Sequence, residues 1–299
     1  MLMTGPARPN GSHYPPITDL VQNVAGLASP PDVYVRIFEL MRTATSSVND
    51  FSRVIIQDPN LTARVLRMVN SSLYGFTNRI DTISRAIAVI GTQELYSLVL
   101  SINVIESFSA ISTKFVDMDR FWRHSVCCAL IARRLSRYCG VLHPERLFVA
   151  GLLHEVGALV LWNRMPEACA TLIENSQGDE DALHQSELHT FGYSHAEVGS
   201  LLMNLWGLPP SLHAAVRGHH LSSRSGVGQL EAAIIRTANL VANRFDYGTL
   251  LSCAESNKIP SSADWEMMGL NDHTIDDETL AEEINQQFCE TFEMLALSK

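Results

Sequence analysis

The sequence lacks paired cysteines and an excess of positive charge. Its six cysteines include no C-x-x-C pair, and the adjacent Cys127 and Cys128 suit neither a common zinc site nor a disulfide framework. Acidic residues outnumber basic ones by 32 to 22, for a formal charge of −10 over 299 residues. Eight acids and one lysine in residues 271–299 account for −7, so the remainder is nearly balanced. This composition argues against a disulfide-stapled fold and against a broad basic surface for nucleic acid.

Long apolar runs are also scarce. The first residues, MLMTGPARPNGSHYPP, lack the apolar centre of a signal peptide. The most apolar stretch is GLLHEVGALVL at 151–161, and His154 and Glu155 interrupt it. A membrane-spanning helix needs roughly 18–20 cleaner residues. We therefore expect a soluble cytoplasmic protein with reduced cysteines and no membrane partner.

Alternating strand-like runs with hairpin turns are missing as well, whereas helical periodicity runs through the chain from about residue 17. A hydrophobic content of 46% is enough for a large core. We expect an all-α fold of two packed helical lobes. The expected parts are a flexible arm at 1–16, an N-terminal lobe at 17–115, a second lobe at 116–250, and a loop with an acidic C-terminal helix at 251–299.

Local signals place individual helices. Asp58 before Pro59 is typical of a helix start, and Gly91 of a helix end. Ser194 and Glu197 stand in capping-box register, which puts His195 at the first helical position. The chain from 247 to 273 looks rich in loops. From these patterns we predict helices over 118–138, 144–163, 193–206, 209–220, 228–246 and 277–297.

Several polar residues fall on apolar helix faces. His124 lies on the apolar side of its predicted helix, and His154 and Glu155 lie in a helix that is apolar nearly all round. His195 shares a face with leucines and a valine, and His219 or His220 points inward from the end of the next helix. Asn239 stands beside Ile235 and Ala242. Together these residues predict a polar pocket inside the second lobe.

Two interpretations of this pocket stay open. Imidazole and carboxylate groups are ordinary ligands of divalent transition metals, so the pocket could hold one iron, zinc, manganese or nickel ion, or a small anion. The candidate metal ligands are His124, His154, Glu155, His195, His219 and His220. The alternative is a hydrogen-bonded histidine cluster that organises the core, because a single buried histidine is more often structural than a ligand.

These residues also follow the ligand order of an HD-type metal phosphohydrolase. The chain is similar above all to the HDOD family, a relative of those enzymes in bacterial signalling, over roughly residues 17–246. The resemblance rests on LASPPDVYVRIFELM, IIQDPNLTARVLRMVNSSLYGF, DTISRAIAVIGTQELYSLVL, FWRHSVCCALIARRL, LFVAGLLHEVGALVL, YSHAEVGSLLMNLWGLPPSLHAAVRGHH and IIRTANLVA. It implies an N-terminal helical lobe packed on an HD-like lobe, and a role beside sensor, kinase or cyclic-di-GMP-related proteins.

Three departures from the enzymes argue against hydrolysis. The resemblance aligns Glu155 with an aspartate, Asn239 with a second aspartate, and Ala158 with a lysine of active relatives. The extra methylene of Glu155 moves its carboxylate by about 1.5 Å, and a misplacement of about 1 Å can cost on the order of 100-fold in rate. Asn239 is neutral and holds a second cation less well.

We therefore expect a non-enzymatic regulatory module that acts through protein–protein contacts, with no catalytic residues and a degenerate pocket. The alternative function is a metal-dependent phosphohydrolase of a nucleotide or cyclic dinucleotide, similar to cyclic di-GMP phosphodiesterases. Nucleic-acid binding has little support. Arg64 and Arg67 lie on a helix that ends at Asn70, but a solvated helix face explains them more simply.

Overall fold

The computed structural model describes residues 14–24, 32–109, 115–221, 228–245, 259–271 and 277–295, where helices are joined by turns and loops and no strand occurs. The all-α prediction is confirmed. The helices are α1 Ile17–Val24, α2 Asp32–Arg42, α3 Val48–Ile56, α4 Pro59–Val69, α5 Ile83–Ile90, α6 Thr92–Ser109, α7 Met118–Tyr138, α8 Glu145–Leu153, α9 Val156–Arg164, α10 Pro166–Ser176, α11 Glu180–Phe191, α12 His195–Leu205, α13 Pro210–Gly218, α14 Gln229–Ala242, α15 Ser262–Met268 and α16 Asp277–Met294.

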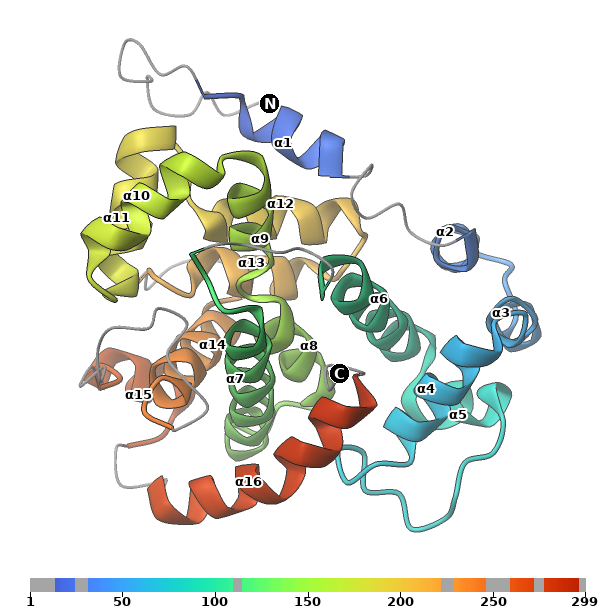
Figure 1. Ribbon diagram of the computed structural model, residues 1–299. Helices are drawn as coiled ribbons and strands as arrows, with labels where there is room; N and C mark the ends of the chain where they lie inside the picture. The colour runs from blue at the N-terminus through green and yellow to red at the C-terminus, as the bar shows by residue number, and fades with distance from the viewer. Residues whose placement is uncertain are drawn as a thin grey trace.

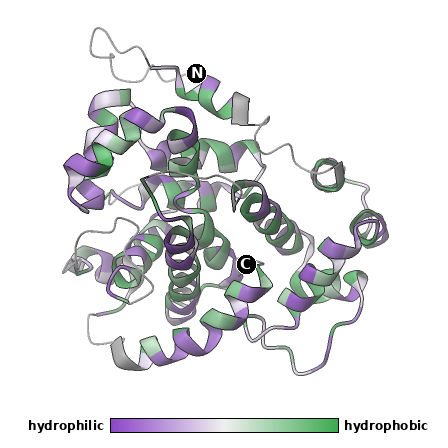
Figure 2. Ribbon diagram, viewed as in Figure 1, coloured by the Kyte–Doolittle hydropathy of each residue, from purple (hydrophilic) through white to green (hydrophobic). Residues whose placement is uncertain are grey.

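The helices form two groups, seen side by side in Figure 1. Helices α2 to α6 pack on one another, and α7 to α14 form the larger group, in which α7, α8 and α14 are central. Contacts between α6 and α8 join the groups, and α16 packs against both α4 and α7. Helix α1 lies against α9 and α12. Figure 2 shows long hydrophilic stretches on the outer helices α11 and α16.

Local sequence signals account for several helix ends. The side chain of Asp58 accepts a hydrogen bond from the backbone of Leu61, and Pro59 begins α4 as expected. Gly91 ends α5 with a φ of 85°, a conformation that favours glycine. Ser194 and Glu197 form the predicted capping box, and His195 is the first residue of α12.

Other helical predictions need correction. The helix expected over 144–163 is two helices, α8 and α9, which are separated at His154 and Glu155. Helices α10 and α11 fill a stretch to which we assigned no helix, and the short α15 lies within the segment expected to be loop-rich. Residues 1–13 of the expected arm, and 110–114 at the expected lobe boundary, lie outside the described residues.

Helix α4 uses its polar residues within the protein. Asn70 donates through Nδ2 to the carbonyl oxygens of Leu66 and Ile80, and its Oδ1 accepts from the Ile80 amide at 2.7 Å. Arg64 donates to Glu106 and to the carbonyl oxygen of Leu295, each at 3.1 Å. These contacts give Arg64 and Asn70 structural roles within the protein.

No single helix among the described residues is long and apolar enough to cross a membrane. Helices α5 and α6 satisfy the length and composition test only as a pair, and the chain bends by 116° between them.

Candidate metal centre

The break between α8 and α9 places His154 and Glu155 in the interior. Glu155 leaves the helical path, with φ −95° and ψ 7°, so the two side chains do not keep the spacing of one continuous helix. Nδ1 of His154 lies 2.7 Å from the carbonyl oxygen of Gly151, which can only accept, so Nδ1 donates. The Nε2 atom is then the free electron-pair donor of a neutral ring, and it lies 3.7 Å from Oε1 of Glu155.

Two glycines let the neighbouring helices approach this break. A Cβ at Gly151 would lie 2.8 Å from Cα of Ala129 in α7. A Cβ at Gly157 would overlap the carbonyl oxygen of His195 and lie 2.5 Å from the backbone nitrogen of Gly199. Helix α9 therefore contacts the start of α12 backbone to backbone, which brings Glu155 close to His195.

His195 is held by Glu187 of α11. Oε2 of Glu187 lies 2.6 Å from Nδ1 of the His195 ring and accepts from its backbone nitrogen at 2.8 Å. An ionised carboxylate can only accept, so Nδ1 carries the proton and Nε2 faces the interior. A carboxylate behind a histidine in this way is the usual second partner of a metal-bound ring.

His219 and His220 follow the last turn of α13. Nδ1 of His219 donates to the carbonyl oxygen of Val216 at 2.5 Å, and Nδ1 of His220 lies 3.1 Å from Oδ1 of Asp181. Arg236 holds this turn, because it donates to the carbonyl oxygen of Gly218 at 3.0 Å and also to that of Leu221. Both rings therefore direct Nε2 inward.

Four side chains converge as a result. One ligand atom from each of Glu155, His195, His219 and His220 lies within 4.8 Å of every other. Nε2 of His195 is 3.6 Å from Glu155 and 3.0 Å from Nε2 of His220, and Nε2 of His219 is 3.6 Å from Glu155. Ligands about 2.1 Å from a tetrahedral ion lie roughly 3.4 Å apart. We call these four residues the histidine centre, and its spacing fits one ion.

Two other predicted ligands lie beside this group. The His154 ring is 5.2 Å, centroid to centroid, from that of His219, and the His124 ring is 5.4 Å from that of His154. Nε2 of His154 and of His219 are buried and make no hydrogen bond within the described structure. Such atoms suit a site that receives an ion.

Electrostatics favour charge separation in the histidine centre. Burial alone would lower the pKa of His195, but the carboxylates of Glu155 and Glu187 outweigh it and raise that pKa to about 10. Burial alone would raise the pKa of Glu155, but His195, His219 and His154 hold it well below its usual value. Burial lowers the pKa of His154 to about 3, so this ring stays neutral. The centre therefore pairs the His195 imidazolium with the Glu155 carboxylate, and a metal ion that binds here would displace the proton from Nε2 of His195.

Asn239 is tied to a carboxylate that the sequence did not suggest. Its Nδ2 donates to Glu180 Oε2 at 2.8 Å, and Nδ2 of Asn243 donates to Glu180 Oε1 at 3.0 Å. Burial and the charge of Glu155 raise the pKa of Glu180 to about 7. Ala158 is buried in α9 and adds no charge. The structure therefore links Asn239 to the histidine centre through α11.

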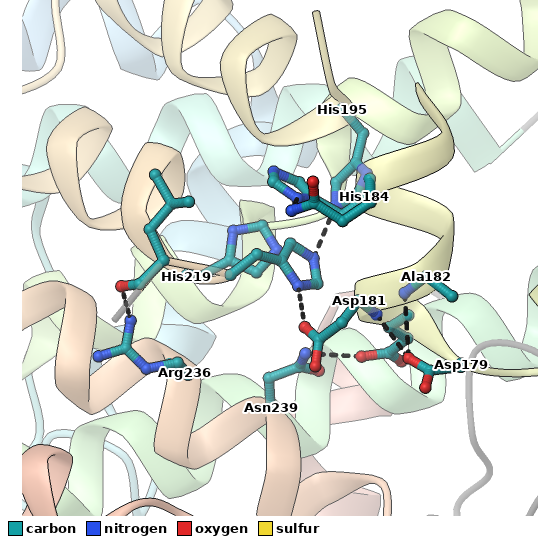
Figure 3. Close-up of polar contacts among 12 residues, drawn as sticks. Asp179, Asp181, Ala182, His184, His195, His219, Arg236 and Asn239 are labelled. Carbon is teal, nitrogen blue, oxygen red and sulfur yellow. Dashed lines mark hydrogen bonds and ion pairs between the residues drawn. The ribbon is translucent and has the colours of Figure 1, made fainter. Parts of the chain in front are cut away.

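Helix α11 supplies the residues that sequence reasoning missed. Glu180, Asp181, His184 and Glu187 are spaced for one helix face, and the His184 ring lies 4.7 Å from that of His220. Figure 3 shows His184, His195 and His219 gathered with Asp181 and Asn239 beside them. The sequence signal that could have identified them is the spacing of Glu180, His184 and Glu187 at i, i+4 and i+7, which places them on one helix face. The stretch lacks an apolar stripe, so hydrophobic periodicity did not reveal this helix.

Comparisons with known proteins agree with this architecture. The HDOD domain family matches residues 27–222. A protein from Shewanella amazonensis SB2B, provisionally named a phosphohydrolase, shares 26% identity, with a TM-score of 0.66 over 95% of this chain and 100% of its own. An HDOD domain protein of unknown function from Geobacter sulfurreducens shares 23% identity, with a TM-score of 0.62 over 92% of this chain and 97% of its own.

One curated relative, an uncharacterized protein from Treponema pallidum, is 25% identical over 195 residues. That match spans 64% of this chain but 37% of the relative. Because the family match covers most of the sequence and the solved relatives share the helical fold, the chain belongs to the HDOD family.

Proposed function

We propose that this chain is a non-enzymatic regulatory module of bacterial signal transduction and acts through contacts with other signalling proteins. The observation that carries the proposal is the closure of the histidine centre. Glu155, His195 and His219 are 2%, 2% and 1% exposed, and His220 is half-buried as a residue with its side chain 3% exposed. A catalytic metal site keeps a coordination position open to water or substrate, whereas a structural site is closed. A closed centre suits a structural role.

The residues fit one metal ion, held by Glu155, His195, His219 and His220. When bound, the ion would supply positive charge that neutralises the carboxylates around the centre. His154 stands next to this set, and its Nε2 faces Glu155. The residues fit a second ion poorly, because Asn239 is neutral and its amide nitrogen donates to Glu180. Two-metal hydrolysis needs both ions.

The second candidate is a metal-dependent phosphohydrolase acting on a nucleotide or cyclic dinucleotide. The convergence of carboxylate and imidazole groups favours it, as does the name of the Shewanella relative. Against it stand the longer side chain of Glu155, the neutral Asn239 and the absence of charge at Ala158. We therefore place it second.

Assays on full-length protein without a His-tag separate the two candidates. Metal content is measured first, and turnover of cyclic di-GMP and nucleoside phosphates is then followed with added Mn²⁺ or Fe²⁺. We expect about one metal ion per chain and no turnover above that of His154→Ala. The exposed His143→Ala is the matched control. Turnover that His154→Ala abolishes and His143→Ala retains would establish the hydrolase instead.

A groove of about 860 Å³ between α4, the 76–81 segment and α16 is the contact surface that we propose. It combines the apolar Phe76 with Arg67 and Glu293, and Phe76 is 39% exposed. In affinity purification from cells that express the chain, Phe76→Ser should reduce recovery of a sensor, kinase or cyclic-di-GMP protein. Leu142 is 83% exposed and lies outside the groove, so Leu142→Ser should leave this recovery unchanged. Equal recovery with both variants would remove the groove from the proposal.

A further inference from the structure

We call the larger group of helices, α7 to α14, the HD-like lobe. Helix α11 is attached to the rest of this lobe largely through polar contacts. Glu187 binds His195 at the start of α12, and Asp181 binds His220 after α13. Glu180 accepts from Asn239 in α14 and from Asn243, the residue that caps the end of this helix. One face of α11 thus contacts three separate elements around the histidine centre.

Apolar anchoring of this helix is uneven. Its buried apolar residues are Leu183 and Phe191, and the other buried positions are His184 and Glu187. Phe191 at the C-terminal end packs edge to face on Tyr14, with ring centroids 4.8 Å apart. Residues 180–188 of α11 therefore depend on hydrogen bonds and charge more than the C-terminal end does.

Carboxyl groups outnumber cationic groups on this face, where the ring of His195 has a raised pKa. Helix α11 brings the carboxyl groups of Glu180, Asp181 and Glu187 to a region that already holds the carboxylate of Glu155. Against them, Nε2 of His154 and of His219 are fully buried, lie within 3.7 Å of Glu155 and make no hydrogen bond. These atoms offer electron pairs, so a cation is the ligand that would balance the carboxylates.

We propose that a metal ion in the histidine centre holds residues 180–188 of α11 on the HD-like lobe, so that this segment detaches when the ion is removed. The inference rests on the metal binding proposed above. An ion that withdraws electrons from Nε2 of His195 and His220 strengthens the hydrogen bonds from their Nδ1 atoms to Glu187 and Asp181. By linkage, docking of α11 raises the affinity for the ion by the same factor by which the bound ion favours docking.

The consequence is a change at the surface that depends on the buried ion. Helices α10 and α11 pack on each other at the outside of the lobe (Figure 1). Release of α11 would uncover His184 and Leu183, which are now buried. A partner could distinguish loaded from stripped protein through this face without reaching the ion.

Hydrogen exchange of the full chain, followed by mass spectrometry, tests the proposal. Protein loaded with Zn²⁺ is compared with protein stripped by a chelator, and metal content is measured on both samples. We expect amide exchange in 180–188 to slow on the order of tenfold or more on loading. Exchange in α5, which lies in the other lobe, should not change.

Variants separate coupling from simple structural support. Glu187→Gln keeps the shape of the side chain but removes its charge. It should therefore lower the ratio of the amide exchange rate of α11 in stripped protein to that in loaded protein. A purely structural role would instead speed exchange equally in both states. Glu174→Gln, at an exposed position in the adjacent α10, is the matched control and should leave the ratio unchanged.

The outcomes distinguish this inference from the proposed function. Stoichiometric zinc with unchanged exchange in α11 would overturn the inference and leave the metal centre in place. Faster exchange in every helix on stripping, α5 included, would also overturn it, because α11 would not be a separate unit. Protein that binds no zinc would overturn the inference and the metal centre together, while the regulatory function would still be decided by the partner-recovery assay.

Discussion

Glu187 binds His195 twice, through the ring nitrogen Nδ1 at 2.6 Å and through the backbone nitrogen at 2.8 Å. One carboxylate oxygen therefore both satisfies an amide in the first turn of α12 and fixes the proton of the ring on Nδ1. The two residues are only eight positions apart along the chain. The pairing orients the first side chain of α12 so that its Nε2 atom faces the histidine centre.

This pairing predicts the effect of neutralising Glu187. We expect Glu187→Gln to lower metal affinity by about 10- to 100-fold, the usual range for loss of a partner behind a metal-bound histidine. Competition with a chromogenic chelator measures the affinity. Glu174→Gln on α10 should retain wild-type affinity, and an equal loss in both variants would contradict the assigned role of Glu187.

The contact between α9 and α12 predicts that Gly157 does not tolerate a side chain. A Cβ there would overlap the carbonyl oxygen of His195, so we expect Gly157→Ala to lower the free energy of unfolding by about 3 kcal/mol, near the upper end of ordinary overpacking. Gly199→Ala at the same crossing should cost less, because its nearest contacts would be 3.3 Å. Urea denaturation of both variants tests the order, and a larger loss at Gly199 would refute this account of the crossing.

Glu94 predicts a pH dependence of stability. Burial, and then the charge of Glu145, raise its pKa to about 7 from an ordinary 4.5. Because protonation is easier in the folded state, the stability linked to Glu94 is fully present below pH 4.5 and is lost as pH rises through about 7. Between pH 5 and 8, the wild type should lose up to about 3 kcal/mol more than Glu94→Gln.

Chemical denaturation at the two pH values measures this difference. Glu39→Gln, an exposed position on α2, provides the control and should follow the wild type. Parallel pH profiles for wild type and Glu94→Gln would mean that Glu94 is not the group responsible.

Asn70 predicts that an isosteric substitution is harmful. Its amide donates to two carbonyl oxygens and accepts from the Ile80 nitrogen. We expect Asn70→Asp to lower the free energy of unfolding by about 1 kcal/mol, since a carboxylate cannot donate to the Ile80 carbonyl oxygen, whereas the Leu66 oxygen keeps the Asn70 backbone amide as a donor. Thermal and urea denaturation test this, with the exposed Asn60→Asp as control. Wild-type stability in Asn70→Asp would show that the amide contacts contribute little.

Local sequence patterns predicted the helices whose signals are local. Helix α7 runs from Met118 to Tyr138 as predicted, and the capping box of Ser194 starts α12 where expected. The apolar positions of the C-terminal helix, such as Leu280, Ile284 and Phe288, are buried. Periodicity and capping depend on residues a few positions apart, so a single sequence contains them.

The sequence alone thus determined that the chain is helical, and it brought attention to His154, Glu155, His195 and the histidines at 219–220. It could not show that the helix breaks at Glu155, because the break depends on the close approach of α9 to His195. Nor could it show that Glu180 and Glu187 face the histidine centre. Helix α11 has no apolar stripe, and its inward face is defined only by partners in α12, α13 and α14. Tertiary structure decided which carboxylates surround the histidines, because hydrogen bonds between distant helices leave no periodic trace in the sequence.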